Sequence, residues 1–146
     1  YWYHFIMFKL LPFHAAYPVS ELETTIDFYS NVLGCAQGRS DSTWVDFDFF
    51  GHQLVFHKVE GFEQRHYFNS VDKHCIPVPH FGSILHWEDW HPFVERLHKH
   101  KIHFVIEPHI RFEGQVGEQA TLFFYDPNQY ALEFKSFRRI ERLFAT

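Results

Sequence analysis

The feature that most restricts how this sequence can fold is an internal repeat. Twice, a strand-like stretch with a histidine near its start runs into an amphipathic helix, first from Pro12-Phe13-His14 and again from Pro79-His80. Later in each half, two strand-like runs flank a short turn, so that residues 47–56 align with residues 124–134. A chain built from two copies of one unit usually buries similar faces of those units in a shared core.

The first unit is predicted to span residues 10–59 in the order β-α-β-β-β. Strands are expected over 10–19, around 36–39, over 43–50 and over 53–59. A helix is expected over 21–33, because apolar residues recur there at helical spacing and Gly34 can end it. Those apolar residues are Leu22, Ile26, Tyr29 and Leu33.

The second unit is predicted to span residues 79–137 and to repeat the same order, which makes the fold class α+β. Its expected elements are strands at 79–85 and 103–106, a helix at 87–100, and a hairpin at 119–125 and 130–135. We interpret residues 107–117 as a loop that leads into this hairpin.

Residues 60–78 separate the two units and are polar, with no clear periodicity. We interpret them as a linker loop. Because so long a connection is unusual in a compact domain, it is predicted to act as a functional loop or lid. Residues 1–9 and 138–146 are interpreted as an N-terminal extension and a C-terminal tail.

Composition excludes several classes of function. A net charge of −5 argues against a nucleic-acid-binding protein, which needs a basic face. No apolar run approaches the roughly 20 residues that a membrane-spanning helix needs. The two cysteines, Cys35 and Cys75, lack the spacing of a disulfide framework or a zinc site. A cytoplasmic protein with free thiols is therefore expected. The 19 Phe, 7 Tyr and 4 Trp residues supply ample apolar area for a core.

Glu133 is out of place in the last strand-like run, because it lies between Leu132 and Phe134. An ionised carboxylate on a packed strand is costly unless it is paired or bound to a cation. Two other interpretations remain open at this point. Glu133 can lie on the solvent face of an edge strand, or it can form a salt bridge with an arginine or lysine.

Four segments resemble the vicinal oxygen chelate superfamily: PFHAAYPV with the DFYSNVLG helix, VPHFG, and DPNQYALEF. This superfamily includes glyoxalase I, fosfomycin-resistance proteins, bleomycin-binding proteins and extradiol ring-cleaving dioxygenases. The resemblance covers about residues 10–137. It implies two βαβββ modules in one chain, whose curled mixed sheets form a cleft that contains a metal ion.

The resemblance also implies that His14, His80 and Glu133 bind one divalent metal ion. A His/His/Glu set with open positions suits Fe2+ best and can also hold Zn2+, Mn2+, Ni2+ or Co2+. Such an ion would polarise the oxygens of a bound substrate.

One position departs from the glyoxalase I pattern, in which the first module's last strand supplies a carboxylate ligand. Aligning the two hairpins places Val55 in that slot, opposite Glu133. Gln53 and His57 lie two residues to either side and point to the same face of the strand. We predict that one of them acts as a weak fourth ligand or a substrate contact. For His57, a hydrogen-bonded core position is the alternative.

Arg111 and His109 are further candidates for substrate binding, because their segment leads directly into the hairpin that carries Glu133. A guanidinium can bind a chelating, anionic substrate through two hydrogen bonds. We therefore predict that Arg111 orients the substrate. A solvated charge cluster or a surface ion pair is the alternative.

Together these features predict a metal-dependent enzyme that acts on a small molecule with vicinal oxygens. Its chemistry would be that of an extradiol dioxygenase, or of a lyase or isomerase. The alternative is a small-molecule binding or resistance protein of the antibiotic-binding kind, without catalysis. A third possibility is an interaction protein whose aromatic surface pairs subunits. We expect a homodimer.

Overall fold

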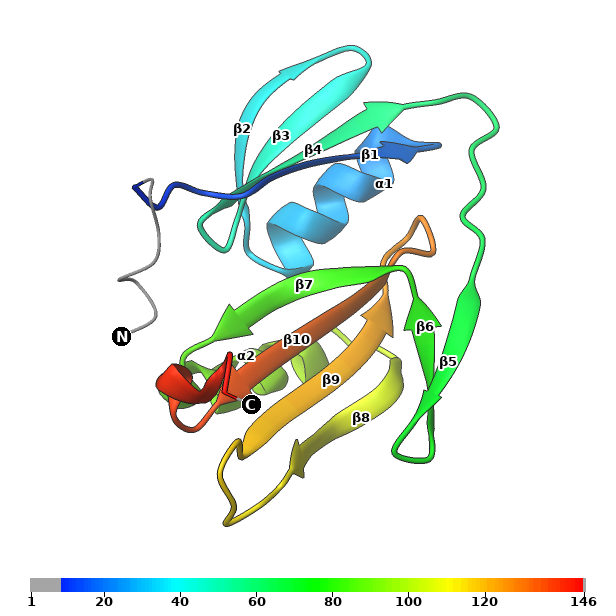
Figure 1. The fold of residues 1–146 in the computed structure, drawn as a ribbon. Coiled ribbons are helices and arrows are strands. Elements are labelled where there is room, and N and C mark those ends of the chain that lie inside the picture. The colour runs from blue at the N-terminus through cyan, green and yellow to red at the C-terminus, as the bar shows by residue number, and fades with distance from the viewer. Residues whose placement is uncertain (1–8, 146) are drawn as a thin grey trace.

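A computed structural model describes residues 9–145 (Figure 1). The first four-stranded sheet has the strand order β1-β4-β3-β2. Its strands are β1 (His14–Val19), β2 (Ala36–Asp41), β3 (Trp44–Phe49) and β4 (His52–Lys58). β1 pairs with β4 in parallel, and the remaining pairs are antiparallel. The predicted extension at residues 1–9 lies, except for Lys9, outside the described residues.

The second sheet repeats the arrangement of the first, in the order β7-β10-β9-β8. Its strands are β7 (His80–Leu85), β8 (Phe104–Arg111), β9 (Gln119–Tyr125) and β10 (Ala131–Phe137). The helical elements are α1 (Leu22–Asp27), continued by a π-helical turn η2 (Phe28–Val32), then α2 (Trp87–Lys99) and a short 3-10 turn η3 (Ile140–Arg142). The predicted α+β fold with two βαβββ modules is confirmed.

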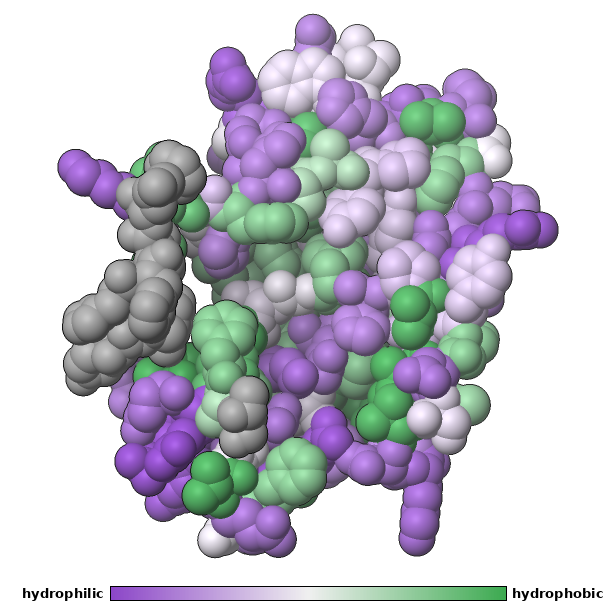
Figure 2. Space-filling view, in the orientation of Figure 1, coloured by the Kyte–Doolittle hydropathy of each residue, from purple (hydrophilic) through white to green (hydrophobic). Residues whose placement is uncertain are grey.

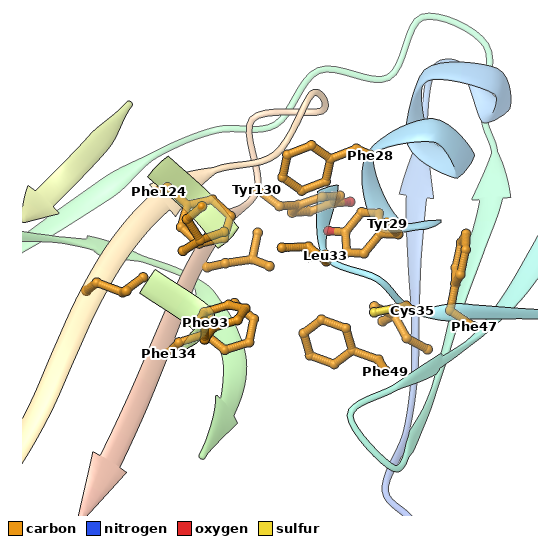
Figure 3. Packing of buried hydrophobic residues seen from close by; sticks show 14 of the residues in the cluster. Phe28, Tyr29, Leu33, Cys35, Phe47, Phe49, Phe93, Phe124, Tyr130 and Phe134 are labelled. Carbon is orange, nitrogen blue, oxygen red and sulfur yellow. The ribbon is translucent and has the colours of Figure 1, made fainter. Parts of the chain in front are cut away.

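The two sheets pack through one face each, and both helices contribute to the layer between them (Figure 3). Tyr29 of the π-helical turn lies 4.7 Å from Phe56 of the first sheet, measured between ring centroids. In the second sheet, Phe134 lies 6.0 Å from Phe49 of the first sheet and 4.6 Å from Phe93 of α2. Because side chains alternate along a strand, each sheet turns its other face away from this core.

Two segments interpreted as loops contain strands. Within 60–78, a hairpin forms from β5 (Tyr67–Val71) and β6 (His74–Val78). Its two-residue turn, Asp72-Lys73, has positive φ at both positions, which is the geometry that suits a hairpin. Residues 107–111, the first part of the segment interpreted as a loop, continue β8 beyond two irregularities in its register. As β8 is an outermost strand, the proline at 108 is tolerated there.

The two cysteines differ in accessibility, which leads to a prediction about their reactivity. Burial raises the pKa of the Cys35 thiol to about 12, whereas Cys75 is exposed. Since the thiolate is the reactive species, we expect a thiol reagent at neutral pH to label Cys75 quickly and Cys35 only after unfolding. Labelling with and without denaturant measures this, with Cys75→Ser as the control. Two rapidly labelled thiols in the folded protein would contradict the prediction.

No helix in the part of the chain that the structure describes is both long and apolar enough to span a membrane. Figure 2 shows a hollow in the molecular surface between the two sheets, where apolar side chains gather.

Candidate metal-binding site

The structure brings His80 and Glu133 together on the outer face of the second sheet. β7 and β10 are parallel neighbours in which His80 pairs with Ala131, and Gly82 pairs with Glu133. The imidazole Nε2 of His80 lies 3.2 Å from the carboxylate Oε1 of Glu133. Both side chains are largely shielded from solvent, at 30% and 13% exposure.

Each member of this pair is held by a hydrogen bond on its other side. Nδ1 of His80 donates to the backbone carbonyl of Pro77 at 2.7 Å. The hydroxyl of Thr121 donates to Oε2 of Glu133 at 2.6 Å, and the ammonium of Lys135 lies 3.9 Å from the same oxygen. Partners of this kind fix the orientation of groups that bind a metal ion.

The pKa values of His80 and Glu133 are each shifted by the interaction between the two groups. The hydrogen bond with Glu133 raises the pKa of the His80 imidazole, although burial opposes this rise. Burial alone would raise the pKa of the Glu133 carboxyl, but hydrogen bonds from His80 and Thr121 outweigh it and lower the pKa. The interpretation of Glu133 as a simple solvent-exposed residue is therefore wrong.

This donor set fits a divalent cation. Because Nδ1 of His80 donates to a carbonyl, Nε2 is the nitrogen that can offer a lone pair. This nitrogen lies 3.2 Å from a carboxylate oxygen of Glu133. Because both atoms are acceptors, so short a distance requires a proton or a cation between them. Imidazole and carboxylate ligands together suit Fe2+ and the related transition metals.

The third expected ligand, His14, lies on the outer face of the other sheet. Along β1, Tyr17 and Val19 face the core, so His14 and Ala16 point away from it. Glu133 likewise lies opposite to Leu132 and Phe134 of the core. Gln53, which contacts His14, lines the same cavity of about 680 Å3 as His80 and Glu133. Within residues 9–145, no group of three or more metal-ligating side chains forms in one chain.

The register of the sheets confirms the aligned positions of the two modules. His14 pairs with Gln53, and two residues further along, Ala16 pairs with Val55. The same steps in the second sheet lead from His80 to Glu133. Val55 therefore lies at the position equivalent to Glu133, as predicted. Gln53 contacts the side chain of His14 directly, with Oε1 2.8 Å from Nδ1.

His57 is separated from this contact. It pairs with Pro18 at the far end of β4, four residues beyond Gln53. At the rise of an extended strand this amounts to about 13 Å. His57 is exposed rather than a core residue, so the alternative of a buried histidine is wrong.

Arg111 and His109 lie at the end of β8, in the same cavity as Glu133. This cavity has a volume of about 160 Å3 and lies between the second sheet and the β5–β6 hairpin. Arg111 forms an ion pair with Asp72 in the hairpin turn. The ring of His109 stacks on that of His74, with centroids 5.1 Å apart. Both residues thus connect the sheet to the hairpin that covers it.

A larger cavity of about 680 Å3 runs along the outermost strand β7, reaching Glu133 at one side. The other walls are mostly aromatic and include Phe13, Tyr17, Phe49, Phe50 and Phe81. Such a lining suits a small molecule with an apolar body.

Sequence reasoning missed three residues of the site: Thr121, Lys135 and Asp72. Thr121 and Lys135 are partners in the β9–β10 register and share the face of Glu133. Period-two alternation over the predicted hairpin was the available signal for both. Asp72 gave no such signal, since its segment was not recognised as a strand pair.

Comparisons with known proteins agree with this fold. The profile of the Glyoxalase/Bleomycin resistance protein/Dioxygenase superfamily matches residues 12–134. The chain belongs to this superfamily. No curated protein matches the sequence significantly.

Several solved structures resemble most of the chain. A glyoxalase/bleomycin resistance protein/dioxygenase from Alicyclobacillus acidocaldarius is 28% identical with a TM-score of 0.74, covering 91% of this chain and 96% of that one. The fosfomycin resistance protein FosX from Listeria monocytogenes is 19% identical with a TM-score of 0.64, covering 94% and 100%. Lactoylglutathione lyase from Agrobacterium tumefaciens is 14% identical with a TM-score of 0.61, covering 92% and 96%. The last two likenesses concern the fold alone.

Proposed function

We propose that this superfamily member is a metal-dependent enzyme that acts on a small molecule with vicinal oxygens. The observation that carries the proposal is the His80–Glu133 pair, in which both groups are oriented by a further hydrogen bond. His80 and Glu133 also line an open cavity, which could admit both a metal ion and a substrate. We favour Fe2+ as the ion, and the chemistry of an extradiol dioxygenase or of a lyase or isomerase.

The third ligand in this proposal is His14 of a second copy of the chain. β1 and β7 are each the outermost strand of their sheet. Setting β1 of one copy beside β7 of another would turn the outer faces of both sheets toward the same side. His14 of one chain would then approach His80 and Glu133 of its partner, and a twofold arrangement would create two such sites.

The chain's own residues would divide the remaining work. A divalent metal bound by these ligands would polarise the oxygens of a chelating substrate. Thr121 and Pro77 would keep the carboxylate and the imidazole in their binding orientation. Arg111 and His109, in the cavity beside Glu133, would bind the charged end of the substrate, in competition with Asp72 for Arg111.

A metal-content measurement with mixed chains tests both parts of the proposal. We expect the purified protein to bind one Fe2+ per chain under anaerobic conditions, and His14→Ala and Glu133→Gln each to lose it. When the two variants are co-expressed in equal amounts, about half of the dimers pair one chain of each kind, and about a quarter of all sites regain every ligand. Metal content should recover to that fraction.

Each result of the metal-content measurement tests a different part of the proposal. Unchanged metal content in Glu133→Gln would remove Glu133 from the site. Full loss in each variant without any recovery in the mixture would place all ligands in one chain. As a matched control, His57→Ala changes an exposed histidine on the outer face of the first sheet and should leave metal content unchanged.

Oxygen uptake by the Fe2+-loaded protein with a panel of catechols distinguishes the reaction types. Uptake would favour oxygenative ring cleavage, and its absence at full metal occupancy would favour lyase or isomerase chemistry. The alternative function, sequestration of a small molecule without catalysis, is supported by the aromatic lining of the 680 Å3 cavity. It would be favoured if the protein bound no metal at all.

A further inference from the structure

We propose that Asp46 is a positioning residue that acts through Gln53 to fix the tautomer of His14. This inference rests on the proposed metal site, in which His14 is a ligand. The three side chains form a continuous chain of hydrogen bonds on the outer face of the first sheet. Nδ1 of His14 lies 2.8 Å from Oε1 of Gln53, and Nε2 of Gln53 lies 3.4 Å from Oδ2 of Asp46.

The direction of both hydrogen bonds follows from the carboxylate of Asp46 at the end of the series. A carboxylate only accepts hydrogen bonds, so Gln53 must turn its amide NH2 toward Asp46. The amide oxygen of Gln53 then faces His14 and must accept a hydrogen bond from its Nδ1–H group. As the two ring nitrogens of a neutral imidazole differ in role, Nε2 of His14 keeps its lone pair.

Asp46 is suited to this task because it is held in place and shielded. The side chain of Asp46 is only 12% exposed, whereas its hydrogen-bonded neighbours Gln53 and His14 are exposed. The guanidinium of Arg39 lies 3.9 Å from Oδ2. Asp46 thus offers a fixed acceptor, against which the flexible Gln53 amide is oriented.

The two histidines of the proposed site reach the same tautomer by different means. In the second module, a backbone carbonyl at Pro77 accepts from Nδ1 of His80. In the first module, a side-chain amide takes that place, and an amide can rotate by half a turn. Without Asp46, Gln53 could present its NH2 to His14 and shift the proton to Nε2, where it would block metal binding.

Nitrogen NMR of histidine tautomers tests the inference without any metal. Spectra recorded at about pH 8 contain mainly neutral imidazoles, and His14→Ala identifies the signals of His14. We expect His14 to carry its proton on Nδ1 in the wild type and to become a mixture of tautomers in Asp46→Asn. The double variant Asp46→Asn/Gln53→Glu has the amide at position 46 and the carboxylate at position 53. Since the carboxylate beside His14 can only accept a hydrogen bond, this variant should restore the Nδ1 proton.

Affinity for Co2+, measured by competition with a chelator, supplies the second readout. Losing an outer partner of a metal ligand typically weakens binding 10–100-fold, and we expect a loss of about 10-fold in Asp46→Asn. The double variant should recover most of it. Asp48→Asn is the matched control, because Asp48 lies two residues along the same strand but accepts from the backbone N–H of Gly51.

The outcomes distinguish this inference from the proposed function. A proton on Nε2 of His14 in the wild type, or an unchanged tautomer and affinity in Asp46→Asn, would overturn the role of Asp46. Equal loss of affinity in Asp46→Asn and in the double variant would also overturn it. Failure of the wild type to bind Co2+, or unchanged affinity in His14→Ala, would instead overturn the metal site itself.

Discussion

Replacing Asp126 by alanine should cost about 4 kcal/mol of unfolding free energy, because it leaves several buried donors without an acceptor. The carboxylate is 2% exposed and accepts from the hydroxyl of Tyr29 at 2.8 Å. It also accepts from the backbone N–H groups of Asn128 and Tyr130 at 2.8 and 2.9 Å. Burial raises the pKa of Asp126, and these hydrogen bonds oppose the rise.

The size of this effect follows from what the network connects. Tyr29 belongs to the first module, whereas Asp126 lies in the turn between β9 and β10 of the second. Asn128 extends the connection by donating to the hydroxyl of Thr25 in α1, at 3.0 Å. A buried donor without a partner costs about 1–3 kcal/mol, so losing this acceptor weakens the turn and the contact between the modules together.

Equilibrium denaturation of Asp126→Ala against the wild type measures the loss. Tyr29→Phe is the graded comparison, since it removes one hydroxyl donor and should cost only about 1–1.5 kcal/mol. If Asp126→Ala proved no more destabilising than Tyr29→Phe, the backbone hydrogen bonds to the carboxylate would contribute little to stability.

Local periodicity explains why most of the fold could be predicted. Strand alternation and helical spacing depend on neighbours in sequence, and both modules follow them closely. The proximity of His80 and Glu133 was predicted through the family resemblance, which implied that both bind one metal ion. The Asp126 turn shows the limit of this reasoning. A polar turn with a proline is usually exposed, and only the packing of α1 against it makes it a buried connection.

The remaining differences have physical causes that sequence patterns do not carry. The β5–β6 hairpin was missed because the residues of β5 are all exposed, which removes the alternation that marks a half-buried strand. His14 was predicted correctly to lie in the first strand of its module, but its distance from Glu133 depends on which faces of the two sheets pack together. That choice is decided by the whole aromatic core rather than by any local motif.

Gly82→Ala should destabilise the protein by at least about 3 kcal/mol, since overpacking a well-packed site typically costs 1–3 kcal/mol and more when backbone must move. A Cβ at this position would lie 2.6 Å from the carbonyl carbon of Glu133 and closer still to its oxygen. Both atoms are backbone, so no side-chain rotation can relieve the overlap. β7 would have to move away from β10, which would separate His80 from Glu133.

Denaturation of Gly82→Ala gives the loss of stability, and metal content would report whether the proposed site survives in the folded fraction. The equivalent position in the first module holds Ala16, which pairs with Val55. Ala16→Gly should therefore cost only about 0.5–1 kcal/mol, which is the usual penalty for a glycine within a strand. Wild-type stability in Gly82→Ala would show that β7 can shift without penalty.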